Sequence, residues 1–175
     1  MLLDLTEVLS QDGKILEKTV LLEIDAFQIR TGRFPLIRKS PLKLEIVNTG
    51  NRVLEIAGYV KLTAVIPCAR CLSPVEQDFV LDIQRQVDMK LSAREREEIL
   101  EESNFIEGNS LDPEILVCNE LLVQWPIRVL CKEDCKGICS RCGANLNDGA
   151  CSCDTAELDP RMAAIRDIFS KFKEV

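Results

Sequence analysis

The sequence predicts an α+β protein: a twisted antiparallel β-sheet or partly closed barrel packed with helices, followed by a cysteine-rich C-terminal segment held together by metal. Three observations predict this fold class. Apolar and polar residues alternate with period two in several runs between residues 15 and 89, as in strands with one buried face. Aspartate directly precedes proline at residues 112–113 and 159–160, which is a helix-start signal. Eight of the nine cysteines fall at residues 68–71 and 131–153.

Residues 1–91 form the predicted β-rich region. Its clearest strand is Val75 to Met89, where apolar side chains alternate with acidic and amide ones. Two further strands are predicted at Leu42 to Ile46 and from Val53 to about Ile66. Strands this long exceed the usual five or six residues, so we expect strong twist. The segment from Gly32 to Pro41 contains two prolines and is predicted to be a loop.

Residues 92–130 are predicted to form an acidic linker and a buried helix. Six glutamates against two arginines between Ser92 and Gly108 indicate a solvated short helix or a flexible linker. Asp112 can cap a helix that has Pro113 in its first turn and runs to about Trp125. Because this helix is apolar on most sides, we expect it to lie buried against the sheet.

Residues 131–175 are predicted to be a cysteine-rich segment with a terminal helix. That helix starts at Asp159 and Pro160 and carries an apolar stripe at helical spacing: Met162, Ile165, Phe169 and Phe172. The stripe fits either a packed core or a docking face.

The sequence predicts a reducing compartment for the cysteines. No run approaches the about 18 apolar residues that span a bilayer, and the N-terminus lacks a signal-peptide pattern. We therefore expect a cytoplasmic protein with no membrane partner. Because cytosolic thiols are kept reduced, the cysteines indicate metal or redox chemistry rather than disulfides.

Cys68 and Cys71 form a C-x-x-C between two long predicted strands and between Pro67 and Pro74. This context predicts a zinc knuckle at a hairpin tip, because two cysteines at this spacing can direct both sulfurs at one ion. The remaining candidate ligands lie in the C-terminal segment: Cys131, Cys135, Cys139, Cys142, Cys151 and Cys153. Zinc takes four tetrahedral ligands, so eight cysteines predict two Zn²⁺ ions and a zinc-stapled C-terminal segment.

Two divisions of these ligands are open. The favoured one joins residues 68, 71, 131 and 135 in one site and residues 139, 142, 151 and 153 in the other, because the second set can close locally. The alternative pairs the knuckles at residues 68–71 and 139–142 as a zinc ribbon. Cys118 is left over as a buried structural thiol. An iron–sulfur cluster and a dithiol redox switch are the competing interpretations of the cysteines.

Catalysis is not expected. The chain has no histidine, which removes imidazole bases and histidine-containing metal sites. A zinc ion with four thiolates has no open coordination position. We therefore expect a protein that is not an enzyme and has no small-molecule substrate.

A basic stretch interrupts the otherwise acidic chain, whose formal net charge is −7. Residues 26–61 contain seven cations and two anions. The cations form the only candidate phosphate-facing surface of the chain: Arg30, Arg33, Arg38, Lys39, Lys43, Arg52 and Lys61.

The order of motifs resembles a known family. PCARCL after a β region, a helix leading into WPIRVLCKEDCKGIC, then CGANLNDGACSCD and a terminal DPRMAAI together resemble the YceD proteins of bacteria, from about Val53 to the end. The resemblance implies a role in accumulation of large-subunit ribosomal RNA and in assembly of the large ribosomal subunit. It implies rRNA, a pre-ribosomal particle or ribosomal proteins as partners, with the seven cations of residues 26–61 as the candidate RNA-binding residues. It also implies Cys68, Cys71 and the region of Cys131 and Cys135 as the more general metal site. The alternatives are a redox- or metal-responsive thiol sensor and a protein–protein adaptor without RNA contact.

Overall fold

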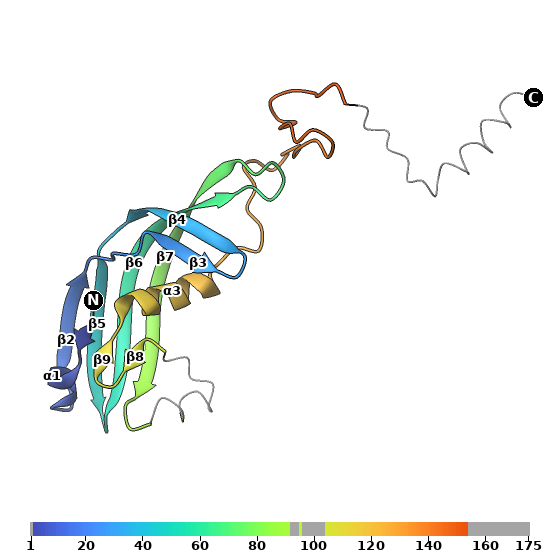
Figure 1. Cartoon of the computed structure of the whole chain (residues 1–175). Coiled ribbons are helices and arrows are strands. Elements are labelled where there is room, and N and C mark those ends of the chain that lie inside the picture. Colours follow the sequence, from blue (N-terminus) through green and yellow to red (C-terminus); the bar gives the residue numbers. More distant parts are fainter. Residues whose placement is uncertain (1, 92–94, 96–103, 154–175) are drawn as a thin grey trace, which may run out of the picture.

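The computed structural model describes residues 2–91, 95 and 104–153 of the 175-residue chain. Figure 1 shows a curved sheet with a helix against one face and the cysteine-rich segment, in orange to red, beyond the end of its two longest strands. The elements in order are β1 (Leu3–Asp4), α1 (Thr6–Leu9), β2 (Ile15–Val20), β3 (Ala26–Ile29), β4 (Gly32–Lys39), β5 (Leu42–Gly50), β6 (Val53–Pro67), β7 (Pro74–Asp88), β8 (Ile106–Glu107), β9 (Ser110–Leu111) and α3 (Pro113–Val123).

The main sheet is antiparallel and open. Its order is β2-β5-β6-β4-β3, with β7 paired along the other side of β6. The prediction of a partly closed barrel is therefore wrong, because no described strand joins β7 to β2 or β3. Residues 53–59 of β6 pair with β5, and residues 62–64 pair with β4. The strand β6 is therefore long because it pairs with two different strands, β5 and β4, along one of its sides. Its length does not close the sheet into a barrel.

The strand β4 contradicts the predicted loop at residues 32–41. Pro35 has no N–H to donate, yet it lies in the part of β4 that pairs with the short strand β3, opposite Ala26. Phe34 and Leu36 are buried, while Arg33 and Pro35 are exposed. The period-two pattern of a strand was therefore present, and the prolines outweighed it in the prediction.

The helix α3 begins as predicted. The side chain of Asp112 accepts hydrogen bonds from the backbone N–H groups of Glu114 (2.9 Å) and Ile115 (3.2 Å). One face is buried against the core and contacts β7. The other face is exposed and includes Leu122 and Val123, so only one side of this apolar helix is covered. Glu120 is buried and accepts a charged hydrogen bond of 2.6 Å from Arg85 Nε on β7.

An aromatic cluster fixes the chain after α3. The ring centroid of Trp125 lies 4.8 Å from those of Phe27 and Phe34, and 5.5 Å from that of Phe79. Three buried phenylalanine rings in tilted and stacked contact with the partly buried Trp125 favour a single position for this turn. The segment that leads to the C-terminal cysteines is thereby anchored on β3, β4 and β7.

The predicted acidic linker and the predicted terminal helix lie partly or wholly outside the described residues. Of the acidic segment at residues 92–108, the described part includes β8, and residues 92–94 and 96–103 lie outside. The predicted helix that starts at Asp159 also lies outside. Among the helices that the structure describes, none is long and apolar enough to cross a membrane.

Candidate metal centres

The first cysteine group is formed by Cys68, Cys71, Cys131 and Cys135, and we call it centre 1. Its four sulfurs lie within 4.8 Å of one another. The sulfurs of Cys68 and Cys135 are 3.8 Å apart, and those of Cys71 and Cys131 are 3.5 Å apart. Tetrahedral zinc with Zn–S bonds of about 2.3 Å holds its sulfurs about 3.8 Å apart. The spacing therefore fits a single ion.

The β6–β7 hairpin positions the first two sulfurs. The last strand pair is Pro67 opposite Pro74, so the C-x-x-C lies at the hairpin tip as predicted. The backbone N–H of Cys68 donates to Ser73 O at 2.8 Å, and that of Leu72 donates to Cys68 O at 3.0 Å. Leu72 has a φ of 62°, a left-handed conformation that is uncommon for residues other than glycine and closes the tight turn of the knuckle.

The other two sulfurs of centre 1 come from the segment that follows the aromatic cluster. The N–H of Ala69 donates to Val129 O at 2.9 Å, which joins this segment to the knuckle just before Cys131. Arg70 Nη1 donates to Cys135 O at 2.8 Å. A Cβ atom on Gly137, which has a φ of 81°, would lie 3.2 Å from Arg70 O. The glycine thus permits close contact between the C-terminal segment and the knuckle.

The second group contains Cys139, Cys142, Cys151 and Cys153, and we call it centre 2. Its four sulfurs also lie within 4.8 Å of one another. The N–H of Gly143 donates to Cys139 O at 2.9 Å, and the φ of Gly143 is 72°. This turn repeats the one in centre 1, where Leu72 occupies the place of the glycine. Centre 2 is more exposed, because only Cys139 is buried.

The two knuckles share an electrostatic pattern. The backbone N–H of Cys71 lowers the pKa of the Cys68 thiol to about 6, and the N–H of Cys142 does the same to the pKa of Cys139. Hydrogen bonding with Cys71 raises the pKa of Cys131 to about 12, and Cys142 acts likewise on the pKa of Cys153. At neutral pH each group therefore contains one cysteine that is mostly ionised, Cys68 or Cys139. It also contains one cysteine, Cys131 or Cys153, that loses its proton only when a cation binds.

The grouping agrees with the favoured division of ligands and not with the ribbon, because neither group mixes residues 68–71 with residues 139–142. All nine cysteines are free thiols.

The ninth, Cys118, is half-buried beside the core, and burial raises the pKa of its thiol. A cluster of several irons would hold its four cysteines further apart than a single ion does, so the close spacing favours one ion per group.

Two polar residues support centre 1 and were missed by sequence reasoning. Arg70 holds the backbone of Cys135, and Asn147 Nδ2 donates to Cys135 Sγ at 3.3 Å. This second bond lowers the pKa of Cys135. Arg70 lies inside the C-x-x-C, where any residue type is common. Asn147 lies in a loop rich in asparagine and glycine, and neither position carries a signal for its partner.

The seven candidate RNA-binding cations do not form one patch. Arg38 lies 2.7 Å from Glu76 and 3.7 Å from Asp78. Lys39 Nζ is 3.6 Å from Asp25 and donates to a backbone carbonyl oxygen. Both cations therefore already have anionic partners among the described residues.

Three of the remaining cations are exposed at opposite ends of the sheet. Arg30 and Arg33 belong to the β3–β4 hairpin, whereas Arg52 lies in the turn between β5 and β6. No described residue forms an ion pair with any of these three. RNA binding by the basic set stays a prediction.

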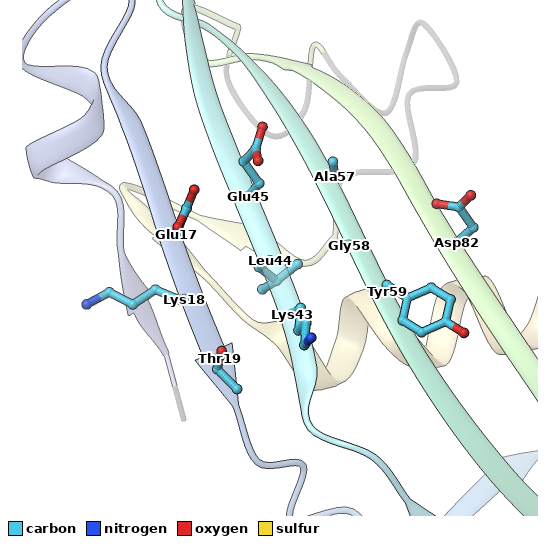
Figure 2. A pocket seen from close by; sticks show the side chains of 10 residues that line it. All are labelled: Glu17, Lys18, Thr19, Lys43, Leu44, Glu45, Ala57, Gly58, Tyr59 and Asp82. Carbon is cyan, nitrogen blue, oxygen red and sulfur yellow. The ribbon is translucent and has the colours of Figure 1, made fainter.

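Lys43 and Lys61 flank Tyr59 on the outer face of the sheet. Lys43 is directly opposite Tyr59, and Lys61 Nζ lies 5.9 Å from the ring centroid. Lys43 and Tyr59 border a hollow of about 530 Å³, and Figure 2 shows the side chains that line it. The hollow is lined by Glu17, Lys18, Thr19, Lys43, Leu44, Glu45, Ala57, Gly58, Tyr59 and Asp82. Its three carboxylates outnumber its two lysines, so it is not a phosphate-binding surface by charge.

Comparison with known proteins gives a family match. A family model described as "Large ribosomal RNA subunit accumulation protein YceD" matches residues 56–169, which is well over half of the chain. The match includes both cysteine groups.

Curated relatives are distant and themselves uncharacterized. Uncharacterized proteins of Mycobacterium bovis and Mycobacterium tuberculosis are 28% identical over 105 residues, which is 60% of this chain and 49% of theirs. One of Mycobacterium leprae is 23% identical over 108 residues, which is 61% of this chain and 50% of its own. The chain thus spans about half the length of the curated relatives it matches. No solved structure matches.

Proposed function

Because the chain belongs to the YceD family of large ribosomal RNA subunit accumulation proteins, we propose that it is a non-enzymatic zinc-binding factor. In this role it supports accumulation of large-subunit ribosomal RNA and assembly of the large ribosomal subunit. The observation that carries the proposal is the family match, which extends across both cysteine groups. The partner is large-subunit rRNA or a pre-ribosomal particle, with ribosomal proteins as further contacts.

Each centre holds one Zn²⁺ in this proposal. The sulfur spacing supports a tetrahedral ion, and the free thiols support thiolate ligation. When four thiolates complete the coordination shell, the ion has no open position for water or substrate. The metal therefore shapes a binding surface and does no chemistry, which supports a protein that is not an enzyme.

In this proposal the rRNA contact involves only part of the basic stretch at residues 26–61. Arg30 and Arg33 are exposed on one hairpin, and no described residue forms an ion pair with them. Free guanidinium groups can pair with phosphate oxygens and release counterions. Arg38 and Lys39 already have anionic partners, so they contribute less.

Two measurements test this proposal. Elemental analysis of protein purified without added metal should give two zinc per chain, and a chain without metal would remove the zinc role. Binding to large-subunit rRNA should weaken with rising salt, and replacing Arg30 and Arg33 with Glu should weaken it about tenfold or more. Arg33→Glu alone is compared with Arg52→Glu at the far end of the sheet, so that each variant of this pair changes the charge equally. Equal loss in both variants would refute the hairpin contact, and no binding by the wild type would refute direct rRNA recognition.

A thiol sensor is a second candidate, favoured by the exposure of Cys131 and Cys142. Peroxide would oxidise a ligand thiolate to sulfenic acid, which would release the ion and free the remaining thiolates of that centre. Zinc retention during treatment with dilute peroxide separates the candidates, because a structural centre keeps its ion while a sensor releases it.

A further inference from the structure

The two cysteine groups use separate ligands but share a short stretch of backbone. Residues 135–139 connect Cys135 of centre 1 to Cys139 of centre 2. The loop of centre 2 pairs with this stretch through a β-bridge between Ile138 and Asn145. The N–H of Cys139 donates to Ala144 O at 2.8 Å, and that of Leu146 donates to Gly137 O at 2.9 Å.

Asn147 extends this pairing to a sulfur of centre 1. Its Nδ2 donates to Cys135 Sγ at 3.3 Å, and its Oδ1 accepts from the backbone N–H of Lys136 at 2.9 Å. Asn145 Oδ1 accepts from both the backbone N–H of Asn147 (3.1 Å) and its Nδ2 (2.8 Å). The amide is therefore held in one orientation by Asn145 of its own loop and by Lys136 of the connecting stretch.

The position of that loop depends on centre 2. Its ends are Cys142 and Cys151, which are both candidate ligands of the second ion. An ion at centre 2 closes the loop and reduces the conformational entropy of the residues that carry Asn147. With the loop closed, the amide is already placed to donate to a thiolate of centre 1.

We propose that Asn147 is a positioning residue that couples the two metal centres, so that an ion at centre 2 raises the affinity of centre 1. This inference rests on the metal sites of the proposed function. A hydrogen-bond donor beside a ligand sulfur typically changes metal affinity 10- to 100-fold. Because coupling between binding sites is reciprocal, centre 1 raises the affinity of centre 2 by the same factor.

The coupling joins a more exposed centre to a more buried one. Centre 1 has three buried cysteines and the exposed Cys131, whereas in centre 2 only Cys139 is buried. Metal therefore leaves centre 2 more readily, and its loss releases Asn147 from Cys135. The affinity of centre 1 then falls although none of its own ligands has changed.

The experiment is a thermodynamic cycle of zinc affinities, measured by competition with a chromophoric chelator. One variant, Cys142→Ser with Cys151→Ser, gives the intrinsic association constant of centre 1. The other, Cys68→Ser with Cys71→Ser, gives that of centre 2. The coupling factor is the overall two-ion constant of the wild type divided by the product of these two constants. We expect a factor of about 10 to 100.

The same cycle in an Asn147→Ala background should give a coupling factor of about 1 to 3, because the bond to Cys135 is absent. Asn119→Ala is the matched control, since its amide is exposed and bonds only with Asn104 among the described residues. It should retain the wild-type factor. Trp125 fluorescence verifies that the sheet is folded in every variant.

The outcomes separate the two proposals. A wild-type chain that takes up two zinc ions with a coupling factor near 1 would overturn this inference and leave the metal sites intact. An unchanged factor in Asn147→Ala would also overturn it, because coupling would then run through the backbone alone. A wild-type chain that takes up no zinc would overturn the metal sites and this inference together.

Discussion

Replacing Gly137 with alanine should weaken centre 1 without changing any ligand. Gly137 has a φ of 81°, and an added Cβ would lie 3.2 Å from Arg70 O. The left-handed conformation costs an alanine about 1–2 kcal/mol. The contact with a backbone oxygen adds to this, because the knuckle or the C-terminal segment must shift by a few tenths of an ångström.

A total of about 2 kcal/mol corresponds to about a 30-fold rise in the zinc dissociation constant of centre 1. The assay is chelator competition in the variant with Cys142→Ser and Cys151→Ser, where centre 1 alone can bind. Centre 1 bears the cost because Gly137 follows Cys135 by two residues and packs on the knuckle that carries the other ligands.

Gly108→Ala is the control for backbone strain. Gly108 has a φ of 58° and nothing within 4 Å of an added Cβ, and it lies between β8 and β9. This variant should lose about 1–2 kcal/mol of unfolding free energy while its zinc affinity stays unchanged. An unchanged zinc affinity in Gly137→Ala would refute the conclusion that contact with the knuckle supports centre 1.

Three further predictions concern the aromatic anchor, the buried ion pair and proton release. Trp125→Ala should lower the unfolding free energy by about 3–5 kcal/mol, measured by urea unfolding followed by circular dichroism. Arg85→Met should lower it by about 2 kcal/mol, because the buried Glu120 carboxylate loses its charged donor. At pH 7.5 zinc should release fewer than four protons per ion, because Cys68 and Cys139 with a pKa of about 6 are already ionised. The number should rise as the pH falls through 6, where these thiolates become protonated, and zinc affinity should fall. Calorimetry in buffers of different ionisation enthalpy counts the protons.

Each of these predictions has an outcome that contradicts it. Trp125→Phe should recover part of the loss, and equal stability of the alanine and phenylalanine variants would remove the anchor role. Arg52→Met changes an exposed cation and should be neutral, so an equal effect there would show that Arg85 acts only through net charge. Release of four protons per zinc at pH 7.5 would show that the knuckle N–H groups do not lower the thiol pKa values.

Local signals predicted the parts of the fold that depend on neighbouring residues. The N-cap at Asp112 and the hairpin around Cys68 and Cys71 are specified by the residues beside them. The change of partner along β6, from β5 to β4, is not specified by neighbouring residues, because it depends on pairing between distant segments. The open edge of the sheet follows from that change of partner, and local signals could not predict it either.

The cysteine groups were predictable for a different reason from their supports. A tetrahedral zinc ion takes four ligands, so the number and spacing of the cysteines limit the possible groups. A donor such as Arg70 or Asn147 needs only to reach one atom, and many residue types at many positions can do so. The ligands therefore leave a pattern in the sequence, whereas the hydrogen bonds that orient them do not.

Residues 131–153 have little apolar core of their own. Among residues 131–153, only Cys135, Gly137 and Cys139 are buried. The apolar cluster around centre 1 consists of three cysteines, with Val75 and Leu130 packed against it. Such burial supplies little stability compared with the ordering of a loop-rich segment. In the proposed function metal binding supplies the difference, so the affinity of each centre includes the free energy of ordering its own loop. Asn147 belongs to one loop and contacts a sulfur of the other centre, and in the proposed coupling it therefore links the two affinities.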